Sequence, residues 1–188
     1  MEAKGTFFVG RKQLIVAQFG EPAWKSFVAH MAAIEPLFEV PVLATDLVPI
    51  PIYLRFQEEM LQRFFQGNDQ AFWKIGEEAG EWALTEGPYK HFRQNPREFT
   101  SFIEKSLPRV WSSYFTRGEL KTSVQGLIVE GELSGLPVWH VTFEYSTMGF
   151  MRRAIELAGF TIKNQHRLKG ISAGDKLIHY RYEIKGTK

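Results

Sequence analysis

Apolar residues in the first two-thirds of the chain recur at the three-to-four-residue spacing of an α-helix. A first helix is predicted from Arg11 to Phe19, and Gly20 and Pro22 separate it from a second. Prolines between residues 40 and 52 exclude a regular helix and favour an extended crossing segment. Three more helices follow, with apolar positions at Phe56, Met60, Leu61 and Phe64, at Phe72, Trp73, Ile75, Ala79 and Trp82, and at Phe99, Phe102, Ile103, Leu107, Val110, Trp111 and Tyr114. Pro108 is expected to bend the last of these.

After Gly118 the apolar spacing changes to the two-residue alternation of β-strands. The pattern predicts one strand around Leu127 and Val129, and another along Trp139 to Phe143. A short helix is expected to start at Ser146 or Thr147 and to stop at Gly159. Two more strands are predicted, at residues 160–168 and 176–184, the first turning His166 toward its apolar face.

The predicted architecture is therefore α+β, with a helical layer packed on an antiparallel sheet. The expected order is five helices, two strands, one helix and two strands. A length of 188 residues suits a single domain over residues 1–188. Its helical part is expected at about residues 8–117, and its sheet part, with one helix, at about 118–186.

The amino-acid composition excludes several kinds of functional site. The chain has no cysteine, which excludes disulfides, thiolate nucleophiles and zinc sites built on sulfur. The amino-terminal residues lack the apolar core of a signal peptide, and no stretch reaches the roughly 20 apolar residues of a membrane helix. These features favour a soluble, cytoplasmic protein.

Charge is uneven along the chain. The net charge is +2, but from Met151 onward nine Lys and Arg face three acids, which gives +6 and leaves −4 for the remainder. A nucleic acid could bind to basic residues on the outer face of the sheet, which would be Lys163, Arg167, Lys169, Arg181 and Lys185. Because no nucleic-acid motif accompanies so few charges, a solvated strand face is the preferred interpretation.

The chain is rich in aromatic residues, at 14% of the sequence. Rings at helical spacing usually form a core, but ring-lined walls with a few polar groups also suit a flat apolar ligand. The candidate ligand-binding residues are Tyr53, Trp73, Trp82, Arg109, Trp111, Phe115 and His166. Gly76 and Gly80 each cost stability inside a helix, so their spacing of four suggests a face for close approach of a partner.

No nucleotide-binding motif is present. The sequence contains neither a phosphate loop nor a dinucleotide fingerprint. Glu77 and Glu81 share one helical face, but without a Glu-x-x-His partner they indicate solvated carboxylates. His166 could ligate haem, yet the Tyr-x-Ser-x-Arg pattern of haem nitric-oxide sensors is missing. We therefore expect no enzyme activity and no cofactor, with haem as the alternative.

Several short segments together resemble bacterial proteins related to the 4-vinyl-reductase domain and, more distantly, to vesicle-tethering TRAPP subunits. They are Phe19 to Trp24, Pro51-Ile52-Tyr53, Ile75-Gly76, Pro108 to Trp111 with Gly118, Gly149 with Ala158-Gly159, and Gly174-Asp175 with Tyr180 and Tyr182. The resemblance implies helices packed on an antiparallel sheet, a homodimer, and a cavity for a small apolar or aromatic ligand. Relatives that hold zinc use cysteines where this chain has His166 and Ile178, so no zinc site is expected.

Two functional hypotheses follow. The first is a non-enzymatic sensory domain that binds a small apolar or aromatic ligand and signals through a dimer. The alternative is a dimeric adaptor without a ligand, which would use the Gly76 and Gly80 face to hold a protein partner.

Overall fold

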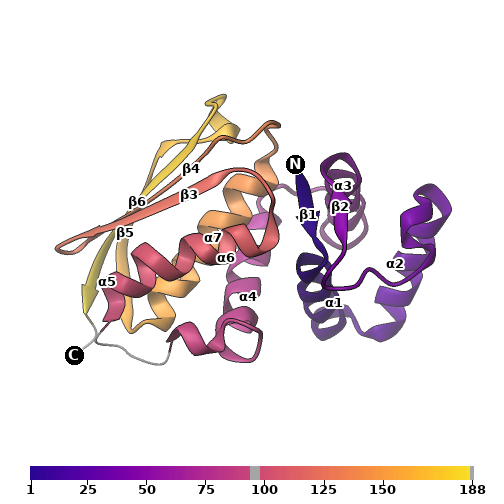
Figure 1. The fold of residues 1–188 in the computed structure, drawn as a ribbon, viewed down its shortest axis with the longest axis horizontal. Coiled ribbons are helices and arrows are strands. Elements are labelled where there is room, and N and C mark those ends of the chain that lie inside the picture. The colour runs from indigo at the N-terminus through magenta and orange to yellow at the C-terminus, as the bar shows by residue number, and fades with distance from the viewer. Residues whose placement is uncertain (94–97, 187–188) are drawn as a thin grey trace. The chain divides into compact units, whose positions relative to one another are not determined.

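The computed structural model describes residues 1–93 and 98–186, without the side chains of Phe92 and Arg93. The chain forms two compact units (Figure 1). Unit 1 comprises Met1–Ala71 and Ser113–Thr116, and unit 2 comprises Phe72–Ser112 and Arg117–Lys188. The single domain expected over residues 1–188, with a helical part at about 8–117 and a sheet part at about 118–186, stays a prediction. Within the described part of the chain, no helix has the length and apolar character to cross a membrane.

Unit 1 is mostly helical. Its elements are β1 (Glu2–Lys4), α1 (Gly5–Phe19), α2 (Glu21–Ile34), the 3-10 helix η1 (Pro36–Glu39), β2 (Leu47–Pro49) and α3 (Ile50–Phe65). Gly20 separates α1 from α2 with a positive φ of 84°, and Pro22 lies in the first turn of α2. The extended segment predicted between residues 40 and 52 contains β2, which pairs antiparallel with β1 through Ala3 and Val48. The sequence pattern missed both short strands.

Rings fill the interior of unit 1. Phe7 lies 4.8 Å from Tyr53 and Phe8 lies 5.0 Å from Phe56, both edge to face. Phe56 also contacts Phe27 at 5.1 Å. Edge-to-face ring pairs of this kind stabilise a core beyond the area they bury. The aromatic richness of the sequence is therefore explained in large part by a packed core.

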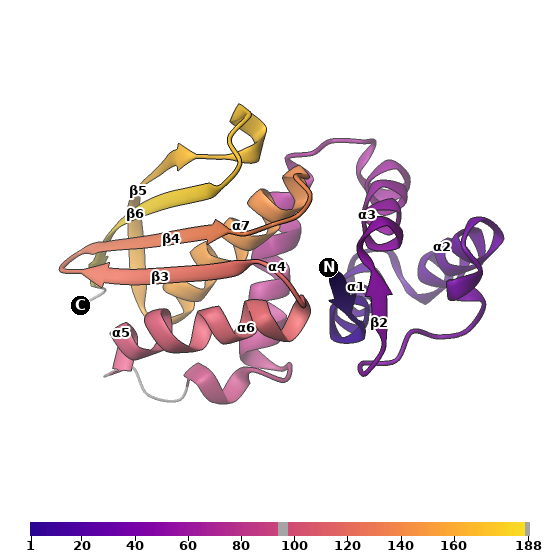
Figure 2. The same cartoon turned by 45° about the horizontal axis from the view of Figure 1, so that its top comes forward.

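Unit 2 combines helices with a four-stranded antiparallel sheet of order β3-β4-β6-β5 (Figure 2). Its helical elements are α4 (Ala71–Thr85), η2 (Lys90–Arg93), α5 (Phe99–Ser101), the π-helix η4 (Phe102–Ser106), α6 (Leu107–Tyr114), α7 (Val141–Leu157) and η5 (Ile171–Ala173). Its strands are β3 (Glu119–Gln125), β4 (Ile128–Ser134), β5 (Phe160–Lys169) and β6 (Ile178–Gly186). The predicted class, helices packed on an antiparallel sheet, is confirmed, whereas the exact element order is not.

The first predicted hairpin was misplaced. The structure pairs β3 with β4 across Gly126, which has a φ of 61°, and the expected strand from Trp139 to Phe143 is wrong. Helix α7 begins there instead, because the His140 side chain accepts a hydrogen bond from the backbone N–H of Thr142. Three alternating apolar residues were too few to separate a strand from the first turn of a helix.

The helix near Pro108 contains a π-helical segment, whereas the sequence predicted a bend. The five residues before Leu107 form a π-helix, and the N–H of Leu107 reaches back to the carbonyl of Phe102. Proline has no N–H and its ring displaces the preceding turn. The wider π-turn between α5 and α6 therefore makes room for the ring of Pro108, which lies in the first turn of α6.

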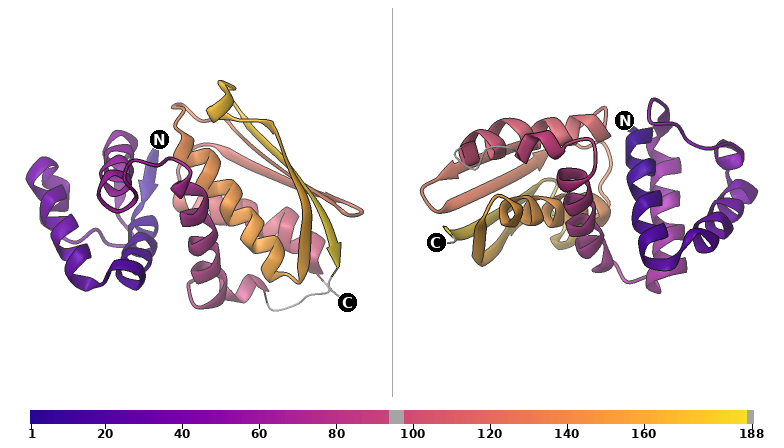
Figure 3. Two further views of the ribbon diagram at one scale, coloured as in Figure 1. Left: turned by 180° about the vertical axis from the view of Figure 1, so that it is seen from behind. Right: turned by 90° about the horizontal axis from the view of Figure 1, so that it is seen from below.

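Helix α7 lies on one face of the sheet and α4 packs against α7 (Figure 3). The Tyr182 hydroxyl donates to the carbonyl of Met148 at 2.8 Å, which ties β6 to α7. A Cβ at Gly76 would collide with the backbone of Ser146, and one at Gly149 would collide with the carbonyl of Trp73. The two helices therefore approach closely because glycine stands on both sides of the contact.

Candidate functional site

An apolar pocket of about 370 Å³ opens on the surface of unit 1. It is lined by Pro36, Leu37, Val40, Pro41, Val42, Asp46, Leu47 and Val48. Val48 is fully buried, whereas Val40 and Leu47 are 67% and 50% exposed. An apolar wall with one carboxylate is the composition of a site for a small, largely apolar ligand.

The loop that forms the pocket is fixed by hydrogen bonds of Asp46. Its carboxylate accepts the N–H of Leu43 at 2.8 Å, and its own N–H donates to the carbonyl of Leu43 at 3.0 Å. Its carbonyl accepts the N–H of Gly5 at 2.8 Å. Because a Cβ at Gly5 would collide with the carbonyl of Leu43, glycine is needed where the loop lies on α1.

The buried side of the pocket is connected by strand pairing to Ser113–Thr116, the second segment of unit 1. Val48 of β2 is opposite Ala3 of β1, and Ala3 in turn bridges to Phe115. The N–H of Glu2 donates to the hydroxyl of Thr116 at 2.9 Å, and the carbonyl of Glu2 accepts the N–H of Thr116 at 3.1 Å. The pocket is thus joined through β1 to the residues that directly follow α6.

Two of the seven predicted ligand-binding residues meet in unit 1. Tyr53 and Phe115 are both buried, with ring centroids 5.3 Å apart. The Tyr53 hydroxyl accepts a hydrogen bond from the side chain of Gln57 at 3.0 Å. Both rings belong to the aromatic core.

The other predicted residues lie in unit 2 and do not form one cluster there. Trp73 is half-buried and its indole N–H donates to Glu77 at 3.0 Å. Trp111 is buried and its indole N–H donates to the carbonyl of Gly118 at 3.1 Å. Trp82 is half-buried, and Arg109 is exposed.

Gly76 and Gly80 are buried against α7 of the same chain, at Ser146 and Phe150 respectively. The close approach that their spacing indicated is therefore made inside unit 2. The neighbouring carboxylates, Glu77 and Glu81, form ion pairs with Arg152 and Arg153 of α7.

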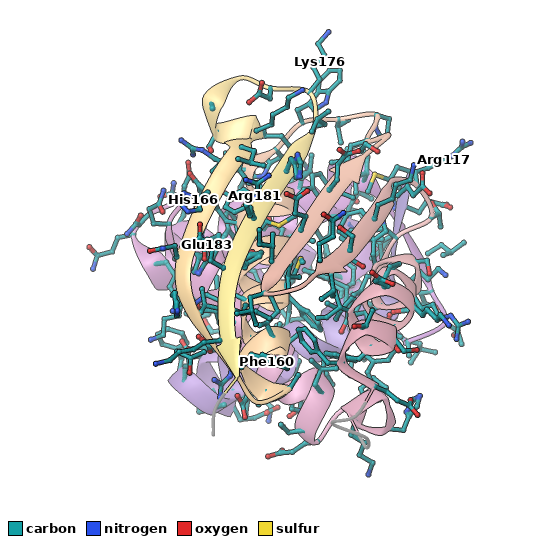
Figure 4. The ribbon with its side chains drawn as sticks, turned by 90° about the vertical axis from the view of Figure 1, so that its left-hand side faces the viewer. Arg117, Phe160, His166, Lys176, Arg181 and Glu183 are labelled. Atoms are coloured by element: carbon teal, nitrogen blue, oxygen red, sulfur yellow. The ribbon has the colours of Figure 1, made fainter. Side chains whose placement is uncertain are left out.

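The predicted orientation of His166 is wrong. Its side chain is 50% exposed on the open face of the sheet and lies 3.2 Å from Glu183. Figure 4 shows His166 of β5 beside Arg181 and Glu183 of β6 on this face. The alternation failed because residues 163–169 are all exposed, so this part of β5 keeps no buried face.

None of the five histidines is buried. His30 pairs with Glu59 at 2.7 Å, and His179 pairs with Glu130 at 3.1 Å. His140 caps α7 through a ring nitrogen, and His91 is exposed. Within the described residues, no group of three or more acidic or histidine side chains could hold a metal ion.

A buried carboxylate forms the main polar cluster of unit 2. Glu144 of α7 is fully buried and accepts hydrogen bonds from the Tyr180 hydroxyl at 2.7 Å and from the Ser172 N–H and hydroxyl, each at 2.8 Å. Arg167 of β5 lies 3.8 Å from it. Burial and the bond to Glu144 raise the pKa of Tyr180, so the phenol stays protonated and donates. This cluster fastens α7 to the connection between β5 and β6.

Sequence reasoning missed the pocket of unit 1, although it identified the segment as extended. A usable signal was present: residues 40–48 combine Val40, Val42, Leu43 and Leu47 with proline, and no helical or strand period assigns these side chains to a core. Apolar residues without a periodic buried face are a sign of an exposed apolar surface.

No family model matches the sequence, and no curated protein matches it. Solved structures do. An Fe(II) H-NOX protein mutant from S. oneidensis has a TM-score of 0.74 at 11% identity, covering 98% of this chain and 97% of that one. An oxygen-bound H-NOX domain related to soluble guanylate cyclases gives 0.69 at 10% identity, over 97% and 95%. An unliganded Fe(II) H-NOX protein from K. algicida gives 0.67 at 11% identity, over 98% and 97%.

Two expectations are corrected by these comparisons. The resemblance to the 4-vinyl-reductase domain and TRAPP subunits is wrong, because the matching structures are H-NOX proteins. The expectation of no cofactor is contradicted as well, since the descriptions of the matching structures name Fe(II), oxygen or heme.

Three of the five histidines of this chain do not fit a haem ligand. A histidine that ligates haem iron is held in an enclosing pocket, with its second nitrogen hydrogen-bonded. Here His30, His166 and His179 pair with carboxylates at the surface, and the last two lie on the outer face of the sheet, which encloses nothing. The comparisons thus show that the chain has the fold of the H-NOX proteins.

Proposed function

We propose that this chain is a non-enzymatic sensory domain that binds a small apolar ligand and signals the binding to a partner. The observation that supports the proposal most is the likeness to H-NOX structures over 97–98% of the chain. The descriptions of those structures name an oxygen complex and NO and CO ligation states, all small and weakly polar molecules. Sensing of a small ligand is the function that such neighbours suggest.

The pocket at residues 36–48 is the proposed ligand site. Its volume of about 370 Å³ falls in the ordinary range for sites that bind small molecules. Val42, Leu37 and Leu47 supply apolar contact, and burial of that surface favours an apolar ligand. Tyr53 and Phe115 belong to the supporting core behind this site in the proposal, rather than to its lining.

Transmission would follow the strands. A ligand that packs on Leu47 restrains β2, and β2 is paired with β1. Strand β1 is bonded to Phe115 and Thr116, which continue the chain from α6. The ligand therefore biases the end of α6 through backbone pairing, the most direct connection that unit 1 offers.

The dimeric adaptor is the weaker hypothesis in this structure. Its support came from Gly76 and Gly80, and both glycines are already covered by α7 of the same chain. A ligand-free adaptor would also leave the apolar pocket of unit 1 without a role.

The test is a titration of the full chain with dissolved xenon, followed by methyl NMR of its valines and leucines. We expect the largest shifts at the pocket, at Val40, Val42, Leu47 and Val48, and their loss in Val42→Asp. Leu127→Asp, at an exposed position of the β3–β4 turn, is the matched control and should keep them. Shifts spread over both units, or none, would refute the assigned site.

Native mass spectrometry and a visible spectrum of the purified protein complete the test. Extra mass lost on denaturation would support a sensor and begin to identify its natural ligand. A Soret band after addition of haem would place the ligand on iron instead, and would refute the pocket as the sensing site.

A further inference from the structure

The strand β5 forms one edge of the four-stranded sheet, and its outer side has no neighbouring strand. All seven residues from Lys163 to Lys169 are exposed. Figure 4 shows β5 at the border of the sheet, with His166 on the open face. Among the described residues, no backbone hydrogen bond joins β5 to an element other than β6.

The opposite edge of the sheet is closed. The carboxylate of Glu104 in η4 accepts the N–H of Val124 in β3 at 3.0 Å. The hydroxyl of Thr122 donates to the carbonyl of Ile103 in the same π-helix. The fold therefore covers the β3 edge with specific bonds and leaves the β5 edge available for another strand.

The exposed part of β5 is basic. Its sequence from residue 163 to 169 contains Lys163, His166, Arg167 and Lys169 and no acid. Glu183 of β6 is already engaged by Asn164 and His166. In the described part of the chain Lys163 and Lys169 form no ion pair, so their charges are available to a partner.

We propose that the outer edge of β5 binds an acidic, extended segment of another protein, which joins the sheet as an additional strand. Backbone hydrogen bonds would supply the pairing, and acidic side chains would lie beside Lys163 and Lys169 at cross-strand distances. A second copy of β5 is a poor occupant, because it would bring like charges together. Lysine residues on an edge strand prevent the edges of two copies from pairing, because their charges repel each other.

Two features limit the length of the bound segment. The register between β5 and β6 is regular from Asn164 to Arg167 and shifts on either side of it. Arg167 is held from inside by Ser172, at 2.6 Å, and by Glu144. A short segment is therefore the expected ligand, since each β-bulge interrupts straight pairing.

The inference goes beyond the proposed sensory function and rests on the strand edge alone. Peptide binding without any xenon response would leave it standing, and a xenon response without peptide binding would refute it while preserving the pocket.

The probe is a fluorescein-labelled peptide of alternating Glu and Val, titrated with the full chain and followed by fluorescence anisotropy. We expect saturable binding that weakens about tenfold in the double variant Lys163→Glu/Lys169→Glu, because two exposed attractions become repulsions. Lys121→Glu, the same change of charge on the covered edge strand β3, should bind as the unmodified chain does. Circular dichroism of each variant confirms that it is folded.

A second peptide separates strand addition from simple charge attraction. Methylation of alternate backbone amides removes the donors of one peptide edge but leaves its charge unchanged, so binding through either edge can be tested with two such peptides. We expect one of them to lose binding. Equal binding by both would refute the added strand. Stronger binding of a single-stranded oligonucleotide than of the peptide, or a dimer abolished by the lysine changes, would assign this edge to nucleic acid or to a second copy.

Discussion

The interiors of the two units are held together by different kinds of contact. In unit 1 the core is built from side-chain rings, such as Phe7 against Tyr53 at 4.8 Å. In unit 2 the contact between α4 and α7 is made by backbone, with Gly76 and Gly149 each against a main-chain group of the other helix. Rings can shift relative to one another at small cost, whereas backbone in contact with backbone has no rotamer to change.

This difference agrees with the distinct tasks that the two proposals give to the units. A ligand-responsive region needs contacts that can adjust, and the pocket of unit 1 lies in front of a core of that type. A unit that presents a binding edge needs a fixed frame, which the glycine contact and the buried Glu144 provide. Changes to each type of contact should therefore differ in size and in extent.

The largest effect is expected from Gly149→Leu. A side chain at this position would collide with the carbonyl of Trp73, and neither helix can move without breaking its contacts with the other elements of unit 2. We expect the free energy of unfolding to fall by more than about 4 kcal/mol, or unit 2 not to fold. Urea unfolding followed by circular dichroism measures this loss. Gly186→Ala, which places a Cβ in open space, should be neutral, and a Gly149→Leu protein as stable as this control would refute the backbone contact.

Phe115→Ala tests the ring-built core of unit 1. Removal of the ring leaves a cavity beside Tyr53 and Phe7, and the expected loss is about 3 kcal/mol. Hydrogen exchange should accelerate in α1 and α3 while α4 and α7 keep their protection. Ile34→Ala, at an exposed position of unit 1, serves as the control. Equal acceleration in both units would show that they unfold together and would remove the distinction between them.

The sequence predicted those parts of the fold in which one periodic pattern extends over many residues. Helix α3 was expected from Tyr53 and begins at Ile50, and the distortion at Pro108 appears as a π-helix. The start of α7 was not predictable from apolar alternation, because the cap formed by His140 decides it. The small strands β1 and β2 were missed because three residues carry no periodic signal.

Less of the candidate site could be predicted. Aromatic residues are a reliable sign of buried area, but the sequence does not say which rings share a core, and the seven expected residues divide between the units. The pocket depends on the turn at Asp46 and on the absence of a side chain at Gly5, which are details of three-dimensional packing. The H-NOX fold itself left no recognisable signal at 10–12% identity.

Glu144→Gln tests the hydrogen bonds that the buried Glu144 accepts from Tyr180 and Ser172 in unit 2. The amide keeps the shape of the carboxylate but directs N–H groups toward some of the donors from Tyr180 and Ser172. We expect a loss of about 2 kcal/mol, because a buried donor is left unsatisfied. Thermal unfolding measures the loss, with the exposed Glu119→Gln as control. An unchanged midpoint would show that the cluster is a consequence of the packing and does not stabilise it.

The smallest effect is expected on the outer face of the sheet, where Glu130 pairs with Arg181 and His179. The hydrogen bond from Arg181 lowers the pKa of Glu130 below its ordinary value of 4.5. The folded state therefore binds the Glu130 proton less tightly than the unfolded chain does, so this pair stabilises the protein above about pH 4.5 and loses its effect as the pH falls through the lowered value. Glu130→Gln should cost only about 0.5 kcal/mol at pH 7, since the pair is partly exposed, and the difference from the unmodified chain should vanish in acid. Urea unfolding at pH 7 and at pH about 3 measures both quantities. A cost as large as that of Glu144→Gln, or one that persists in acid, would mean that the open face is as rigid as the buried frame, and the contrast between a carboxylate inside unit 2 and one on its surface would fail.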